Sequence, residues 1–137
     1  MKQGIQMDFP HESLRKSGCY FFTLLRWAEI LKGDELEFST QDVIRIFARC
    51  REEGFVEDDC FIVNPVGVLN FCLDRRRFKT VFMSKIQPTE PLYAVYLKRP
   101  GHGHFVLGGG SRIVWDSYDP NRPAAKEYSI DSFRVII

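Results

Sequence analysis

The change in residue pattern near Leu73 constrains the fold of this chain more than any other feature. Before Leu73, apolar residues recur at spacings of three and four, which is the period of a helix. After it, short runs of β-branched and aromatic residues are separated by Pro, Gly and Asn, which is typical of strands. Helices followed by strands predict an α+β fold in one compact unit. We expect a single domain over residues 1–137, a length that permits a sizeable core.

The N-terminal half predicts a central helix with further helices beside it. Helices are expected over residues 19–31, from a cap at Ser39 or Thr40 to a C′ glycine at Gly54, and over 64–73, with residues 1–16 irregular. Because the segment 19–31 is apolar on nearly all sides, it should be buried in the middle of the domain and should pack on the sheet. Asn64 is expected to cap the third helix, with Pro65 in its first turn.

The C-terminal half predicts an antiparallel sheet. Strands are expected at residues 78–83, 92–98, 104–107, 112–116 and 132–137. The segment HFVLGGGSRIVWD should form a hairpin that turns at Gly108–Ser111. This register brings His104 opposite Trp115 or Asp116, where a carboxylate can accept the imidazole N–H and orient the ring. Gly101 and Gly103 are expected to leave the surroundings of the histidine uncrowded.

Composition and charge exclude several classes of protein. With 19 basic and 18 acidic residues the net charge is +1, so we expect neither a nucleic-acid partner nor an anionic membrane surface. The N-terminus lacks a signal-peptide core, and the longest apolar-rich segment is interrupted by polar residues and too short to span a bilayer. These observations predict a soluble, cytoplasmic protein.

The four cysteines, at positions 19, 50, 60 and 72, form no CxxC pair. Zinc ligation is therefore not expected, and we predict no metal and no cofactor. Free thiols are expected in place of disulfides. Cys50 and Cys72 should be buried packing residues, because both lie in apolar patterns.

Cys19 differs from the other cysteines because it begins the predicted central helix. The partial positive charge of a helix N-terminus favours the thiolate, and a nearby imidazolium would favour it further. The alternative is that Cys19 packs in the core and that His104 is a structural histidine. His102 is expected in the loop before its strand, and Trp115 and Tyr118 in the core or in a cleft wall.

The segments SGCYFFTLLRWAE, GHGHFVL and IVWDSYDP together resemble the papain-like cysteine peptidase superfamily. The resemblance is greatest to its minimal forms, such as the bacteriocin-leader peptidases, and extends to small uncharacterised bacterial and phage-borne proteins. It implies Cys19 as nucleophile, His104 as base and Asp116 as orienting acid, with a peptide or protein substrate. Asp119 is the alternative third member, because an aspartate followed by proline is common there in the family.

One departure from the family pattern concerns the oxyanion. The family usually has a glutamine about six residues before the nucleophile, and this chain has Ser13 there, with Gln3 and Gln6 further upstream. Losing an oxyanion donor costs about 10²–10³ in rate. Two functions therefore stay open: a cysteine peptidase or amidase, and a catalytically inactive papain-like fold that serves as a binding or structural module.

Overall fold

The structure, a computed structural model, describes residues 1–33, 36–118 and 127–137. Over these residues it has four helices and five strands. The helices are α1 (Glu12–Ser17), α2 (Cys19–Lys32), α3 (Thr40–Glu52) and α4 (Pro65–Leu73), and the strands are β1 (Val81–Ser84), β2 (Tyr93–Arg99), β3 (His102–Gly109), β4 (Arg112–Trp115) and β5 (Ser129–Ile136).

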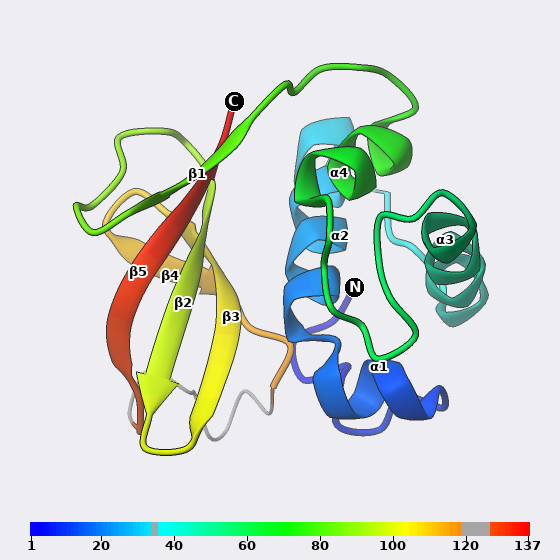
Figure 1. The fold of residues 1–137 in the computed structure, drawn as a ribbon, viewed down its shortest axis with the longest axis horizontal. Helices are drawn as coiled ribbons and strands as arrows, with labels where there is room; N and C mark the ends of the chain where they lie inside the picture. Colours follow the sequence, from blue (N-terminus) through cyan, green and yellow to red (C-terminus); the bar gives the residue numbers. More distant parts are fainter. Residues whose placement is uncertain (34–35, 119–126) are drawn as a thin grey trace.

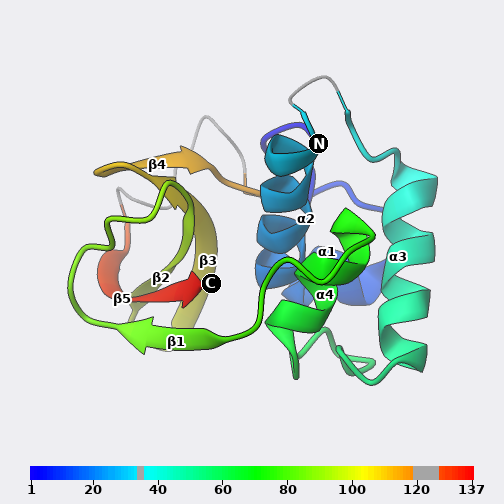
Figure 2. The ribbon, with the colours of Figure 1, turned by 90° about the horizontal axis from the view of Figure 1, so that it is seen from above.

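The helices pack on one antiparallel sheet with strand order β1-β5-β2-β3-β4. Figures 1 and 2 show the sheet on one side of α2 and the helix α3 on the other, so α2 is the central layer. The predicted α+β fold, with helices in the first half and the sheet in the second, is confirmed.

Helix α2 is buried around almost its whole circumference, as its apolar sequence predicts. Phe21, Leu24 and Leu25 have no exposed surface, and the polar Thr23 is buried with them. The Thr23 hydroxyl lies 2.8 Å from the Cys19 carbonyl oxygen one turn earlier and 3.4 Å from the Phe105 carbonyl oxygen of β3. Thr23 thereby satisfies its buried hydroxyl and links the helix to the sheet.

The caps of α3 and α4 follow the sequence closely. Ser39 accepts a hydrogen bond from Asp42 N while the Asp42 side chain accepts one from Ser39 N, which is a capping box. Asn64 Oδ1 accepts from Gly67 N at the start of α4. The irregular segment expected over residues 1–16 is wrong in part, because α1 forms from Glu12 with His11 as its N-cap. Six residues are too few to show a helical period.

The strand pairing corrects the expected hairpin register. The turn is two residues long, because Gly109 pairs with Arg112, and a bulge then places Leu107 opposite Trp115. The register expected from a turn at Gly108–Ser111 is therefore wrong by two or three residues at His104. Strand bounds also differ, since β1 begins at Val81 and β5 at Ser129, whereas 78 and 132 were predicted.

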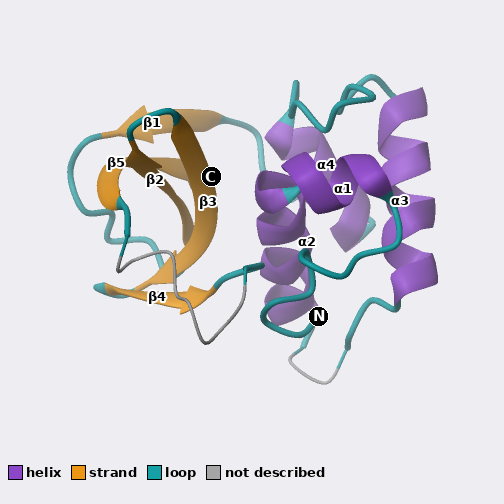
Figure 3. Cartoon of the chain, turned by 90° about the horizontal axis from the view of Figure 1, so that it is seen from below, coloured by secondary structure: helices purple, strands orange, loops and turns teal. Residues whose placement is uncertain are grey.

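The apolar residues form two clusters, one on each side of the sheet. The larger cluster fills the space between the sheet and the helices and includes Phe22, Trp27, Phe47 and Leu69. The smaller cluster contains Tyr93, Val95, Leu97, Val106 and Phe133. Figure 3 shows that the sheet curves away from the helices, so its far side is concave. The smaller cluster lies on that side, because its residues alternate along the strands with those of the larger cluster.

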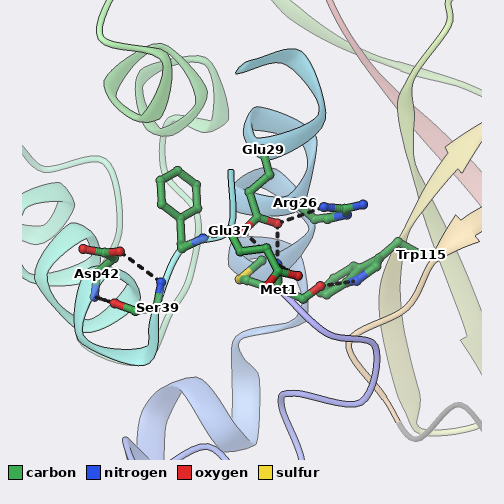
Figure 4. Close-up of polar contacts among 8 residues, drawn as sticks. Met1, Arg26, Glu29, Glu37, Ser39, Asp42 and Trp115 are labelled. Carbon is green, nitrogen blue, oxygen red and sulfur yellow. Dashed lines mark hydrogen bonds and ion pairs between the residues drawn. The ribbon is translucent and has the colours of Figure 1, made fainter. Parts of the chain in front are cut away.

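A buried carboxylate on α2 joins the N-terminal segment to the residues that precede α3 (Figure 4). Both Glu29 oxygens accept hydrogen bonds from the Met1 amino group, at 2.6 and 2.7 Å. Phe38 N donates to the same carboxylate at 2.6 Å and Arg26 Nη1 at 3.2 Å. The Met1 carbonyl oxygen accepts from Trp115 Nε1, which ties the network to the end of β4.

Candidate active site

Cys19 is the first residue of α2, and the tight junction with α1 holds it there. Gly18 N donates to the Leu14 carbonyl oxygen in the last turn of α1. The Gly18 carbonyl oxygen accepts from Phe22 N in the first turn of α2. A Cβ on Gly18 would lie 2.4 Å from that Leu14 oxygen and 3.0 Å from Phe22. Only glycine fits between the helices, which explains the Gly-Cys pair. The thiol is half-buried and lies beside the backbone N–H groups of the first helical turn.

His104 and Asp116 form a buried hydrogen-bonded pair, as expected from the sequence. His104 Nε2 donates to Asp116 Oδ1 at 2.7 Å, and the side chains are 0% and 8% exposed. The pair does not arise from residues directly opposite each other. Continued past Trp115, the observed register puts Tyr118 opposite His104. Asp116 is the diagonal neighbour, and its side chain reaches across to the ring.

The Cys19 thiol lies next to the imidazole of His104. Burial lowers the pKa of His104, but the hydrogen bond to Asp116 and the interaction with the Cys19 thiol raise it, and the net change is upward from 6.5. Nδ1 is buried and makes no well-formed hydrogen bond to the described residues. Since Asp116 occupies Nε2, Nδ1 is the nitrogen left to exchange a proton with the thiol. Such contacts are often loose in the absence of a substrate.

Tyr118 covers one face of the His104 ring. The two rings are stacked, with centroids 3.6 Å apart and planes 16° from parallel. Tyr118 N donates to Asp116 Oδ1 at 2.8 Å, and the Tyr118 hydroxyl is hydrogen bonded to His102 Nε2 at 3.2 Å. Tyr118 is half-buried and packs on the His104–Asp116 pair, and it is not among the residues that line the cleft beside Cys19. His102 is exposed, but it begins β3, so its expected place in a loop is wrong.

A cleft of about 490 Å³ opens beside the thiol. Its lining comes from the start of α2, the loop between α3 and α4, and strands β3 and β5: Ser17, Cys19, Tyr20, Asp59, Cys60, Phe61, Ile62, Phe105 and Arg134. Sequence analysis singled out only Cys19 among these residues. The others come from four separate segments that only the tertiary structure brings together.

The surroundings of His104 are more crowded than expected. A Cβ on Gly103 would lie 2.0 Å from the Tyr96 hydroxyl, so the missing side chain makes room for the Tyr96 ring. Gly103 therefore permits a close packing contact with Tyr96, while His104 itself is fully buried under the stacked Tyr118 ring, so the expected open space around the histidine is wrong.

The side chain of Gln6, one of the two upstream glutamines, is engaged in hydrogen bonds away from the oxyanion position. Gln6 is buried, its Nε2 donates to the Arg15 carbonyl at 3.1 Å, and its Oε1 accepts from Ser117 Oγ at 2.6 Å. Gln6 N also donates to the Ser117 carbonyl, so this residue fixes the segment that follows Asp116. Gln3 is exposed, and Ser13 lies half-buried on α1. The backbone N–H groups at the start of α2 are the remaining candidates.

The other cysteines are buried and unpaired by disulfides, as expected for Cys50 and Cys72. Burial raises the pKa of Cys50 to about 12, and burial also raises the pKa of Cys60 to about 12. In the part of the chain that the structure describes, no cluster of three His, Cys, Asp or Glu residues suits a metal ion. Asp119, the alternative third member, lies outside the described residues.

Replacing Asp116 with asparagine should lower the pKa of His104. The substitution removes the carboxylate that favours the imidazolium and leaves the burial that opposes it. Titration of the histidine ring resonances by NMR measures this shift, with His11, the N-cap residue of α1, as an internal reference. An unchanged His104 midpoint would show that Asp116 does not set the charge of the ring.

The same shift has a defined consequence for stability. Because the folded-state pKa of His104 lies above its ordinary value of 6.5, protonation stabilises the folded state. This contribution is fully present below pH 6.5 and is lost as the pH rises through the folded-state pKa. The wild type should therefore exceed Asp116→Asn in free energy of unfolding by less as the pH rises through the folded-state pKa of His104. Urea unfolding of both proteins over a series of pH values measures this difference.

Fold and site together define an α+β protein in which a cysteine at a helix N-terminus meets a buried His–Asp pair beside a cleft. The chain belongs to the family described as "Protein of unknown function, DUF261", which it matches over residues 5–137. Neither the curated proteins nor the solved structures gave a match. No helix among the described residues is both long and apolar enough to cross a bilayer.

Proposed function

We propose that the protein is a cysteine peptidase or amidase in which Cys19, His104 and Asp116 act as a triad. The observation that carries the proposal is the His104 ring, which is bonded to Asp116 through Nε2 and has Nδ1 free next to the Cys19 thiol. Similarity of the three motifs to the papain-like peptidases supports the same assignment. The buried carboxylate would orient the ring and stabilise its charged form.

The steps of the proposed reaction follow from these positions. Cys19 transfers its proton to His104, and the thiolate attacks the carbonyl carbon of an amide. The N–H groups at the start of α2 stabilise the negative oxygen of the tetrahedral intermediate. The C–N bond then breaks, the leaving amine takes the proton from His104, and a thioester to Cys19 remains. Water, deprotonated by His104, attacks the thioester, which releases the acid and restores the thiol.

A catalytically inactive binding or structural module is the second candidate. It is favoured by the oxyanion position, since Ser13 stands where a glutamine is usual and the Gln6 side chain is held by Arg15 and Ser117. In this alternative the Cys19–His104 contact is structural and does not catalyse a reaction.

Thiol reactivity against pH separates the two candidates. If His104 holds the proton, iodoacetamide should alkylate Cys19 at pH 6, well below the ordinary thiol pKa of about 8.5. Mass spectrometry of the peptides quantifies each site, and Cys60 is a matched internal control because it lines the same cleft and burial raises its pKa to about 12. Alkylation of Cys19 only near pH 8.5 would favour the inactive module.

A further inference from the structure

The wall of the cleft formed by β5 carries a guanidinium, that of Arg134, which forms no ion pair with a carboxylate of the described residues. Arg134 Nη1 donates to Ser132 Oγ at 2.8 Å and to the Phe133 carbonyl at 3.3 Å. No carboxylate of the described residues lies within ion-pair distance of it. The acid closest in sequence, Asp131, is 3.5 Å from Lys85 and accepts a hydrogen bond from Ser132 Oγ. Arg134 is half-buried in the cleft, and no described residue pairs with its charge.

Aromatic rings hold this guanidinium in place. Arg134 lies over the rings of Phe105 and Tyr96, at 5.6 and 5.7 Å from their centroids. The Tyr20 ring stacks on Phe105, one of these two rings, and the centroids of Tyr20 and Phe105 are 4.0 Å apart. A planar cation that is fixed by ring contacts and by hydrogen bonds to a hydroxyl and a backbone carbonyl is preorganised to bind a planar anion.

A second unpaired polar group lies beside Arg134. The Tyr20 hydroxyl is buried and makes no hydrogen bond to any residue that the structure describes. Burial raises the pKa of Tyr20 to about 12, and the charge of Arg134 opposes this rise only partly, so the hydroxyl keeps its proton. A buried donor without an acceptor costs free energy, which a ligand oxygen would recover. Tyr20 is also adjacent in sequence to Cys19.

The loop residues that line the rest of the cleft do not neutralise the charge of Arg134. Asp59 is exposed, and its Oδ1 accepts a hydrogen bond from Phe61 N at 3.0 Å within its own loop. Phe61, 62% exposed, and Ile62 add apolar surface to the cleft. Among the described residues, the cleft thus combines an apolar wall with the guanidinium of Arg134 and the hydroxyl donor of Tyr20.

We propose that the cleft binds a carboxylate of the substrate at Arg134 and Tyr20. The proposal rests on the proposed function and specifies its substrate class, which is a peptide with a carboxylate close to the bond that Cys19 attacks. That carboxylate belongs either to an acidic side chain or to the C-terminus of the peptide, and both present the same two oxygens to the guanidinium.

Binding to the Cys19→Ala protein tests this site without requiring turnover. The probes are synthetic hexapeptide mixtures with Glu or its isostere Gln at one fixed position, each made with a C-terminal acid and with a C-terminal amide. Charged hydrogen bonds of this kind change affinity roughly tenfold or more, so carboxylate peptides should bind at least that much more tightly. The Glu/Gln comparison reports a side chain, and the acid/amide comparison reports a C-terminus.

Variants assign the preference to the two residues. Arg134→Gln should remove the carboxylate preference, Arg134→Lys should keep part of it, and Tyr20→Phe should weaken it. Arg99→Gln is the matched control, because Arg99 also lies over a tyrosine ring, at 4.9 Å, but outside the cleft. The preference should survive that substitution. If Arg134→Gln does not fold, the four peptide mixtures on the parent protein still give the answer.

The outcomes separate this inference from the proposed function. If Gln and amide peptides bind as tightly as their carboxylate counterparts, or if Arg134→Gln keeps the preference, the carboxylate site is wrong whether or not the wild type hydrolyses peptides. If the preference is present and depends on Arg134 but the wild type turns over no peptide, the site stands and the hydrolase proposal fails.

Discussion

Replacing Cys19 with alanine is expected to abolish peptide hydrolysis and to leave the fold nearly unchanged. Removing the nucleophile of a triad typically lowers the rate by roughly 10⁴ or more. Because the thiol is half-buried at a cleft, its loss should lower the free energy of unfolding by less than about 1 kcal/mol. The measurement pairs digestion of a broad fluorogenic peptide library with a thermal melt of each protein.

Cys60→Ala is the matched control for this prediction. Cys60 lines the same cleft, and alanine retains its β-carbon, so the variant should keep hydrolysis. The proposed function would be contradicted if the wild type hydrolysed no peptide and Cys19→Ala lost about 1–3 kcal/mol of its free energy of unfolding. A loss of that size is typical of a truncation in the core. Cys19 would then be a packing residue, and the departure at Ser13 would mark a fold that has lost its reaction.

Replacing Glu29 with alanine should cause the largest loss of stability. The carboxylate is completely buried and accepts hydrogen bonds from the Met1 amino group, Phe38 N and Arg26. Removing one partner of a buried ion pair leaves the other charge buried and uncompensated, which costs about 3–5 kcal/mol. Urea unfolding followed by circular dichroism measures the change.

Glu37→Ala provides the comparison, because this carboxylate approaches the same amino group from solvent. It lies 3.8 Å from Met1 N, and its side chain is 64% exposed. An exposed ion pair contributes at most about 1 kcal/mol, so the variant should unfold close to the wild type. Equal losses for the two variants would mean that burial of Glu29 does not determine the strength of its ion pair.

Local patterns in the sequence determined the elements that hold the candidate site. The apolar periodicity of residues 19–31 led to α2, which ends one residue later, at Lys32. Ser39 and Asn64 cap their helices as predicted, since capping depends on residues within one turn. The same locality explains the identification of Cys19 at a helix N-terminus, because Gly18 and the helix that follows are adjacent in the chain.

The contact of His104 with Asp116 was predicted for a reason that is only half right. A hairpin between residues 104 and 116 brings the two side chains near each other in several registers. The actual register depends on a bulge at Leu107 and Gly108, which no local pattern indicates. The predicted pair is present because an aspartate side chain spans a diagonal neighbour, while Tyr118 takes the directly opposite place and stacks on the ring.

The cleft and its charges were decided by tertiary structure alone. Arg134, Tyr20 and the loop containing Phe61 are far apart in the sequence, and nothing in their immediate neighbours marks them as a group. Whether a guanidinium is paired or a hydroxyl is buried depends on which segments pack against it, and those contacts are long-range. The sequence by itself therefore determined helices α2, α3 and α4, the approximate positions of strands β1 to β5, and the choice of the three candidate catalytic residues, while it missed α1. Register, burial and the chemistry of the cleft followed only from packing.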